Sequence, residues 1–239
     1  MKIKIGHLYP DLLNLYGDRG NIQCMKKRCE WRGIEAEVQA FHITDKIDFS
    51  DLDIVLLGGG SDREQMLVCE KLKPIQADMK AYVEDGGSVL AVCGGYQLLG
   101  HYYDTEEGRI EGLSLVDLYT EHGDPRLISN IVLENEMFAH PIVGFENHGG
   151  RTYIGDNKPF GKVLFGHGNN EKDGTEGVLY KNIVGTYLHG PLLPKNPHIS
   201  DYLIGNAMER KYGVKELAAL DDSQELAANK YIVDRFVKQ

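Results

Sequence analysis

The sequence predicts an α/β fold with a mainly parallel sheet covered by helices on both faces, followed by a β-rich second half. Strand and helix patterns alternate through residues 1–100. Two apolar runs, residues 53–57 and 88–92, are typical of buried parallel strands. Each run ends in a glycine turn, at Gly58-Gly59-Gly60 and at Cys93-Gly94-Gly95. Ligands bind beyond the carboxyl ends of such strands, so we expect both turns in one candidate site.

Apolar periodicity and turn residues set the expected order of elements. The first part is expected to contain strands at residues 2–5, 34–41, 53–57 and 88–92, and helices at 21–32, at 63–85 with an interruption near Pro74, and after Cys93-Gly94-Gly95 through Leu99. Shorter, glycine-punctuated β segments follow between residues 108 and 187, at 127–133, 142–145, 162–166 and 177–187, and helices return at 198–212 and 223–237. No repeat or linker interrupts the chain, so residues 1–239 are expected to form a single domain.

Composition narrows the class of protein. The net charge of -10 over 239 residues argues against a nucleic-acid binder or a surface that docks on anionic lipid. The four cysteines are too few and too scattered for a disulfide framework, and no CxxC or HExxH pattern indicates a metal site. No segment has the pattern of a signal peptide or a membrane-spanning helix. The sequence therefore predicts a cytoplasmic protein without a metal site.

A nucleophile is indicated at the end of the second apolar run. There the predicted strand reaches Cys93, two glycines follow, and a helix begins. This is the cysteine version of the nucleophile elbow, with Ala91 in place of the first glycine. At a helix N-terminus the dipole favours thiolate and backbone amides can bind an oxyanion. The alternative is a buried structural cysteine, and we interpret Cys24, Cys29 and Cys69 in that way because they lack this context.

The nine residues 92–100, VCGGYQLLG, resemble the nucleophile motif of class I glutamine amidotransferases. They are most similar to the branch that contains the cobyric acid and cobyrinic acid diamide synthases. The resemblance implies a flavodoxin-like fold and a glutaminase activity in which Cys93 forms a glutamyl thioester. It also implies that Gln97 contacts the substrate.

An oxyanion hole needs two backbone N–H groups near the nucleophile. The elbow supplies that of Gly94, and the second is expected from Gly58-Gly59-Gly60, with the resemblance favouring Gly60 or its neighbours. The triple glycine could instead cradle a phosphate, although no GxxxxGK[ST] motif is present, or it could form a simple turn.

His189 is the expected general base among the nine histidines. It follows an apolar strand in the segment TYLHG, residues 186–190, which resembles the segment around the catalytic histidine of the same branch. A histidine at a strand end can reach a cysteine at a neighbouring strand end. His148 is the rival, and we interpret it as a residue that lines the site.

One position departs from the family pattern. Many class I amidotransferases carry a glutamate two residues after the histidine, where it orients the imidazole, but this chain has Pro191. Three explanations stay open: a Cys–His dyad suffices, another acid of this chain serves, or a carboxylate arrives from a partner protein. The third would couple glutamine hydrolysis to complex formation.

Longer motifs indicate what receives the ammonia. The segments concerned are LNLYGDRGN at residues 13–21, GGGSDREQ at 58–65, GFENHGGRT at 144–152 and the stretch 185–196. They are similar to the glutaminase subunits of lipid II isoglutaminyl synthases. This resemblance runs from Leu13 to about Lys211. It implies a heterodimer with a Mur-ligase-like subunit that binds ATP and Mg²⁺ and amidates the D-glutamate α-carboxyl of the peptidoglycan stem peptide in lipid II. No cofactor is expected in this chain.

The same resemblance implies that Arg126, ahead of a β segment, helps bind substrate; the alternative is a solvated charge in a turn. Asp18 and Arg19 could fix the first turn or contact the partner. Three other functions compete with this interpretation. The chain could serve a corrinoid or another carboxylate, it could be a cysteine hydrolase without glutamine specificity, or it could be a scaffold subunit.

Overall fold

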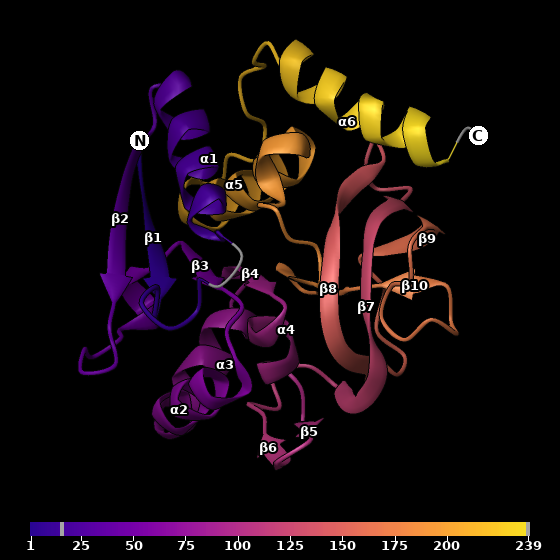
Figure 1. Ribbon diagram of the computed structural model, residues 1–239. Coiled ribbons are helices and arrows are strands. Elements are labelled where there is room, and N and C mark those ends of the chain that lie inside the picture. Colours follow the sequence, from indigo (N-terminus) through magenta and orange to yellow (C-terminus); the bar gives the residue numbers. More distant parts are fainter. Residues whose placement is uncertain (15–16, 238–239) are drawn as a thin grey trace.

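The computed structural model describes residues 1–14 and 17–237 (Figure 1). Two residues of the 13–21 motif, Leu15 and Tyr16, lie outside the described residues. The expected helix at 223–237 is described up to its last residue.

The first sheet has six strands in the order β11-β12-β4-β3-β1-β2. All neighbours in it are parallel except β11 and β12, which form an antiparallel pair. Its members are β1 (Lys2–Leu8), β2 (Glu35–Phe41), β3 (Ile54–Leu57), β4 (Ser88–Val92), β11 (Val178–Tyr180) and β12 (Ile183–Thr186). Every residue of β3, β4 and β12 is buried, as expected of strands covered on both faces.

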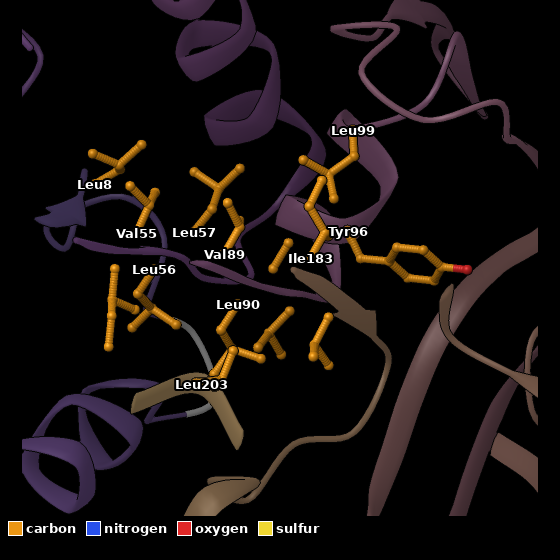
Figure 2. Packing of buried hydrophobic residues seen from close by; sticks show 14 of the residues in the cluster. Leu8, Val55, Leu56, Leu57, Val89, Leu90, Tyr96, Leu99, Ile183 and Leu203 are labelled. Carbon is orange, nitrogen blue, oxygen red and sulfur yellow. The ribbon is translucent and has the colours of Figure 1, made fainter. Parts of the chain in front are cut away.

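Helices cover the two faces of this sheet (Figure 1). On one face lie α1 (Arg19–Trp31) and α5 (Pro197–Tyr212), and on the other α2 (Asp62–Leu72), α3 (Gln76–Glu84) and the short α4 (Gly94–Leu98). Successive strand side chains alternate between these two layers. Figure 2 shows Leu56 and Leu90 on the side of Leu203 of α5, and Leu57 and Val89 on the opposite side.

A second sheet follows, in the order β10-β9-β7-β5-β6, with β8 paired to β7. Its strands are β5 (Tyr102–Thr105), β6 (Gly108–Glu111), β7 (Tyr119–Glu134), β8 (Ile142–Tyr153), β9 (Gly161–Phe165) and β10 (Thr175–Glu176). Three 3₁₀ turns, η1 (Phe49–Asp51), η2 (Lys73–Ile75) and η3 (Leu193–Lys195), and the C-terminal helix α6 (Ser223–Phe236) complete the described elements. The β7–β8 hairpin stands beside the parallel sheet, and α6 lies across its end (Figure 1).

The predicted fold class is confirmed, with local differences. The helical stretch 63–85 consists of α2, η2 and α3, and the β segment 177–187 is a hairpin of β11 and β12 that turns at Lys181, whose φ is 52°. Strands β7 and β8 extend well beyond the expected 127–133 and 142–145. Their additional residues include polar and glycine positions, which weaken the apolar alternation on which the sequence prediction rests.

A buried arginine joins the N-terminal and C-terminal helices. The Arg28 side chain is 2% exposed and its guanidinium contacts Asp201 of α5 at 2.7 Å and Asp222, the residue before α6, at 2.6 Å. Arg32 contacts Asp201 as well, at 2.6 Å. A buried charge is tolerated only when it is paired, so this cluster fixes α1, α5 and the start of α6 relative to one another.

We predict that Arg28→Met lowers the free energy of unfolding by about 3 kcal/mol, because it leaves two partly buried carboxylates without their main partner. Urea unfolding followed by circular dichroism measures the change. Lys27→Met is the matched control, since the Lys27 side chain is 56% exposed and its ion pair with Glu30 lies at the surface. Equal stability of the two variants would contradict the role given to Arg28.

Candidate active site

Cys93 stands on a strained turn between β4 and α4. Its backbone has φ 52° and ψ -109°, a region that residues other than glycine rarely occupy. The turn is held by two hydrogen bonds: the Cys93 N–H donates to the Thr186 carbonyl at 2.8 Å, and its carbonyl accepts from the Gln97 N–H at 3.0 Å. A strand, a residue with positive φ and a helix in succession form the elbow that the sequence indicates, and they place Cys93, which is buried, at the strand end.

The two glycines after Cys93 are required by close packing. A Cβ on Gly95 would lie 2.4 Å from the Leu57 carbonyl oxygen, and one on Gly94 would lie 2.6 Å from the Gln65 side chain. The Gly95 N–H donates to the Gly58 carbonyl at 3.0 Å, which ties the start of α4 to the end of β3. A side chain at Gly95 would push the elbow away from β3, and one at Gly94 would displace the Gln65 side chain.

His189 approaches Cys93 from the next strand, β12. Strands β4 and β12 are parallel, with Val92 opposite Thr186, so both chains continue past the same edge of the sheet. The His189 N–H donates to the Phe145 carbonyl at 2.7 Å, which anchors this segment to β8. A Cβ built on Gly59 would lie 3.6 Å from the Cys93 Sγ and 3.6 Å from the His189 Cε1. The thiol and the imidazole therefore both lie next to the position that a Gly59 side chain would occupy.

A cavity of about 320 Å³ opens beside the thiol, a size that suits a small molecule. Its lining includes three of the residues singled out in the sequence as substrate contacts: Gly60, Gln97 and Arg126. His148 lines it too, as the sequence interpretation has it. The sequence did not single out the other contributors, which are Ser61, Asp62, Gln65, Tyr103 and Gly149. Gly94 and His189 are not among the lining residues.

Arg126 reaches the cavity because β7 bulges. The register of β7 with β8 jumps from His122 opposite Gly150 to Leu127 opposite His148, which leaves residues 123–126 outside the regular ladder. The Arg126 guanidinium donates to the side chain and the carbonyl oxygen of Asn147, each at 3.1 Å. Burial has the largest effect on the two reacting groups: it raises the pKa of Cys93 and lowers that of His189. The positive charge of Arg126 has a smaller effect and lowers both pKa values. Held in this way, Arg126 is suited to bind a carboxylate in the cavity.

The inner wall is a buried polar network centred on Tyr187. The Tyr187 hydroxyl accepts a hydrogen bond from the Gln97 amide at 3.1 Å and shares another with Thr152 at 2.5 Å. The His148 ring stacks on Tyr187 with 3.6 Å between ring centroids, and its Nδ1–H donates to the Gly150 carbonyl at 2.8 Å. His148 is therefore fixed as a wall of the cavity, and Gln97 is held with its amide at the surface of that wall.

Burial dominates the electrostatics of the Cys–His pair. It raises the pKa of the Cys93 thiol to about 12, with a further increase from the Asp18 carboxylate, against the opposing hydrogen bond from the Gly94 N–H. Burial also lowers the pKa of His189 to about 3, assisted by His148 and Arg126. The sequence predicts a position that favours thiolate, and the structure differs: the desolvation of the sulfur outweighs the short helix and the Gly94 amide. At neutral pH the free chain holds a neutral thiol beside a neutral imidazole.

The two sequence features left open, Asp18 and Pro191, meet at the first turn of α1. Asp18 is fully buried, and its Oδ2 accepts the Gly59 N–H at 2.9 Å. Pro191 packs on Gly20, where a Cβ would lie 2.3 Å from the proline ring. Arg19, in contrast, is fixed through its own N–H, which donates to the Asn14 side chain at 3.0 Å. Asp18 thus contacts the glycine next to which both the thiol and the imidazole lie.

A cysteine on a strand-to-helix elbow, a histidine shortly after the adjacent parallel strand and an arginine beside a small cavity form an arrangement suited to Cys–His acyl transfer on an α/β sheet. The chain belongs to the CobB/CobQ-like glutamine amidotransferase family, whose domain matches residues 4–197.

Two relatives match almost the whole chain. The lipid II isoglutaminyl synthase (glutamine-hydrolyzing) subunit GatD of Staphylococcus aureus is 46% identical, over 100% of this chain and 98% of the relative. The subunit of the same name from Streptococcus pneumoniae is 42% identical, over 95% of this chain and 89% of the relative. The cobyric acid synthase of Listeria innocua is 31% identical over 66% of this chain, which corresponds to only 32% of that enzyme.

Solved structures support the fold. A crystal structure of a glutamine amidotransferase superposes on 85% of this chain and 98% of its own, with a TM-score of 0.52 at 15% identity. At this identity the likeness concerns the fold alone.

We predict that Cys93 in the free chain reacts at least about tenfold more slowly with iodoacetamide at pH 7.5 than free cysteine does, because its pKa lies above that of an ordinary thiol. The rate should climb steadily as the pH rises above 9. Peptide mass spectrometry identifies the labelled cysteine and gives its rate. Labelling that is complete and fast near pH 6, as for an activated thiolate, would contradict this picture.

Proposed function

We propose that this chain is the glutaminase subunit of a lipid II isoglutaminyl synthase. It would hydrolyse L-glutamine and deliver ammonia to a Mur-ligase-like synthetase subunit. The observation that carries the glutaminase part is the placement of Cys93 and His189 next to the same glycine, Gly59, with Cys93 at a cavity that Arg126 also lines. Similarity to the two GatD subunits along the full chain supports the particular pathway.

The cavity suggests how glutamine binds. The Arg126 guanidinium pairs with the α-carboxylate, which places the side-chain amide toward Cys93. Gln97, held by the Tyr187 hydroxyl, contacts the bound glutamine from the inner wall. His148, stacked on Tyr187, closes the same side.

The reaction proceeds by nucleophilic catalysis. The Cys93 sulfur attacks the amide carbon while its proton passes to His189, which is neutral and therefore able to accept it. The N–H groups of Gly94 and Gly60 bind the tetrahedral oxyanion. As the C–N bond breaks, His189 returns the proton to the leaving nitrogen and ammonia departs. Water then attacks the glutamyl thioester, again with His189 as base, and releases glutamate and the free thiol.

The fate of the ammonia follows from the chemistry of amides. A carboxylate does not react with ammonia unless it is activated, normally by ATP, and the Mur-ligase-like partner supplies ATP and Mg²⁺ for this step. In the proposed complex the acceptor is the α-carboxyl of the stem-peptide D-glutamate in lipid II. No helix in the described part of the chain is long and apolar enough to cross a membrane. We place the heterodimer in the cytoplasm, where glutamine and ATP are available.

The chain is further proposed to work as a single domain. One hydrophobic cluster includes residues of both sheets, among them Ile54 of β3 and Ile131 of β7. A corrinoid acceptor is the alternative, and it is less well supported because the cobyric acid synthases match only part of this chain.

Arg126→Ala should raise the KM for glutamine by about tenfold to a hundredfold, because it removes a charge-assisted pair with the substrate carboxylate. Steady-state ammonia release by the chain with its partner measures the change. Arg109→Ala is the control, since Arg109 pairs with Asp104 on the exposed β5–β6 hairpin and should leave the KM unchanged. An unchanged KM in Arg126→Ala would assign the α-carboxylate to another group.

The proposed function as a whole predicts ammonia release from glutamine that disappears in Cys93→Ala and persists in Cys24→Ala. We would measure it with the purified chain alone and with the candidate synthetase subunit, and follow amidation of lipid II in the presence of ATP. Ammonia release that depends on the partner would favour a partner carboxylate that orients His189. Release by the chain alone would favour a Cys93–His189 pair that needs no residue from the partner. An assembled complex that releases no ammonia would overturn the proposal.

A further inference from the structure

The glycine run between β3 and α2 passes through a space too narrow for any side chain. A Cβ on Gly58 would lie 2.2 Å from the Leu13 carbonyl oxygen, and one on Gly59 would lie 3.0 Å from the Cys93 Cβ. The run therefore lies between the loop after β1 on one side and the nucleophile on the other. Three glycines in succession have no side chains of their own to fix their peptide planes.

Two side chains from other segments, Asp18 and Gln65, hold the backbone before and after the Gly59–Gly60 amide. Asp18 accepts the Gly59 N–H at 2.9 Å, and the Gln65 amide donates to the Gly60 carbonyl at 3.1 Å. Beyond it, the Ser61 N–H donates to Glu64 at 2.9 Å in a capping box that begins α2. Among residues 1–14 and 17–237 no acceptor contacts the Gly60 N–H, and Gly60 lines the cavity beside Cys93.

We propose that Asp18 is a positioning residue of the oxyanion site: by holding the Gly59 N–H, its carboxylate fixes the Gly58–Gly59 peptide plane, so that the next amide, the Gly60 N–H, faces the reacting carbonyl. The inference rests on the proposed function, in which Gly94 and Gly60 bind the oxyanion. It assigns to Asp18 a role that the sequence alone leaves open.

The unfavourable burial of the Asp18 carboxylate supports this role. Asp18 occupies the N-cap position of α1 but makes no capping hydrogen bond with its side chain, so it does not serve the helix in the usual way. It is fully buried, and its Oδ1 has no partner within the described residues. A buried, half-satisfied carboxylate destabilises a fold. The Gly59 N–H is the contact that gives this carboxylate a use.

The charge of Asp18 separates two possible roles. Three charged groups act on the Cys93 thiol: Asp18 and Asp62 raise its pKa and Arg126 lowers it. A negative charge beside the nucleophile hinders formation of the thiolate, so the charge itself does not assist catalysis. Asp18→Asn removes the charge but keeps an oxygen acceptor for the Gly59 N–H, whereas Asp18→Ala removes both.

Steady-state glutaminase kinetics of the chain with its synthetase partner test the proposal. We expect Asp18→Ala to lower kcat by about a hundredfold, the effect of losing one oxyanion donor, with KM for glutamine changed less than about threefold. Asp18→Asn should recover most of kcat. Asp53→Asn and Asp53→Ala are matched controls, because Asp53 is a buried carboxylate that accepts the Lys4 N–H at 2.7 Å at the other end of the sheet. Both controls should keep the kcat of the unmodified complex.

Alkylation of Cys93 provides a second measurement that does not depend on turnover. Loss of the Asp18 charge should shift the pH dependence of iodoacetamide labelling to lower pH in both Asp18 variants. Slow turnover in Asp18→Ala together with an accessible, easily alkylated thiol locates the defect at the oxyanion site.

An unchanged kcat in Asp18→Ala, or a kcat in Asp18→Asn as low as in Asp18→Ala, overturns the inference while leaving the proposed function intact. An unmodified complex that releases no ammonia overturns the proposed function, and the inference with it.

Discussion

The arrangement of this protein depends on one steric constraint: the space between Cys93 and the loop after β1 is so narrow that only glycine backbone, residues 58–60, fits in it. Strands β3, β4 and β12 end at the same edge of the parallel sheet. At that edge the glycine run after β3 separates the Cys93 thiol from the loop after β1, and Gly59 touches both Cys93 and His189. Because no side chain fits there, the glycine run can present backbone N–H groups to the reacting atoms but no side-chain groups. The elbow after Cys93 is equally tightly packed, because Gly95 lies against the Leu57 carbonyl of β3 and leaves no room for a side chain.

This close packing also sets the electrostatics. Exclusion of water raises the pKa of the thiol and lowers that of the imidazole, so the pair is neutral before glutamine arrives. A neutral imidazole can accept the proton at the moment of attack, which makes the reaction depend on correct placement of substrate rather than on a preformed thiolate. Arg126, in a bulge of the second sheet, lines the cavity and is proposed to provide that placement. In this proposal the β-rich half supplies substrate contacts, and the parallel sheet supplies the reacting groups.

Local patterns predicted the parallel sheet and the elbow because both are encoded by contiguous residues. The run 88–92 is bounded as expected, and the small residues after Cys93 mark the turn. The approach of His189 to the cysteine follows from strand order, for which the TYLHG resemblance gave the cue. The cavity contribution of Tyr103 and the support that Tyr187 gives Gln97 could not be predicted, since they arise from long-range packing. Asp18 carried a partial signal: its place in a long motif marked it as a residue that could fix the first turn or contact the partner, but gave no indication of its bond to Gly59.

The central claim is that Cys93 attacks the glutamine side chain, and the most direct test is to trap the intermediate. The chain and its synthetase partner would be mixed with glutamine, quenched in acid within milliseconds to seconds, and digested for mass spectrometry. The account predicts a glutamyl thioester on the peptide that contains Cys93, absent from Cys93→Ala and from samples without glutamine. Ammonia release without any adduct on Cys93, or an adduct on another cysteine, would contradict it.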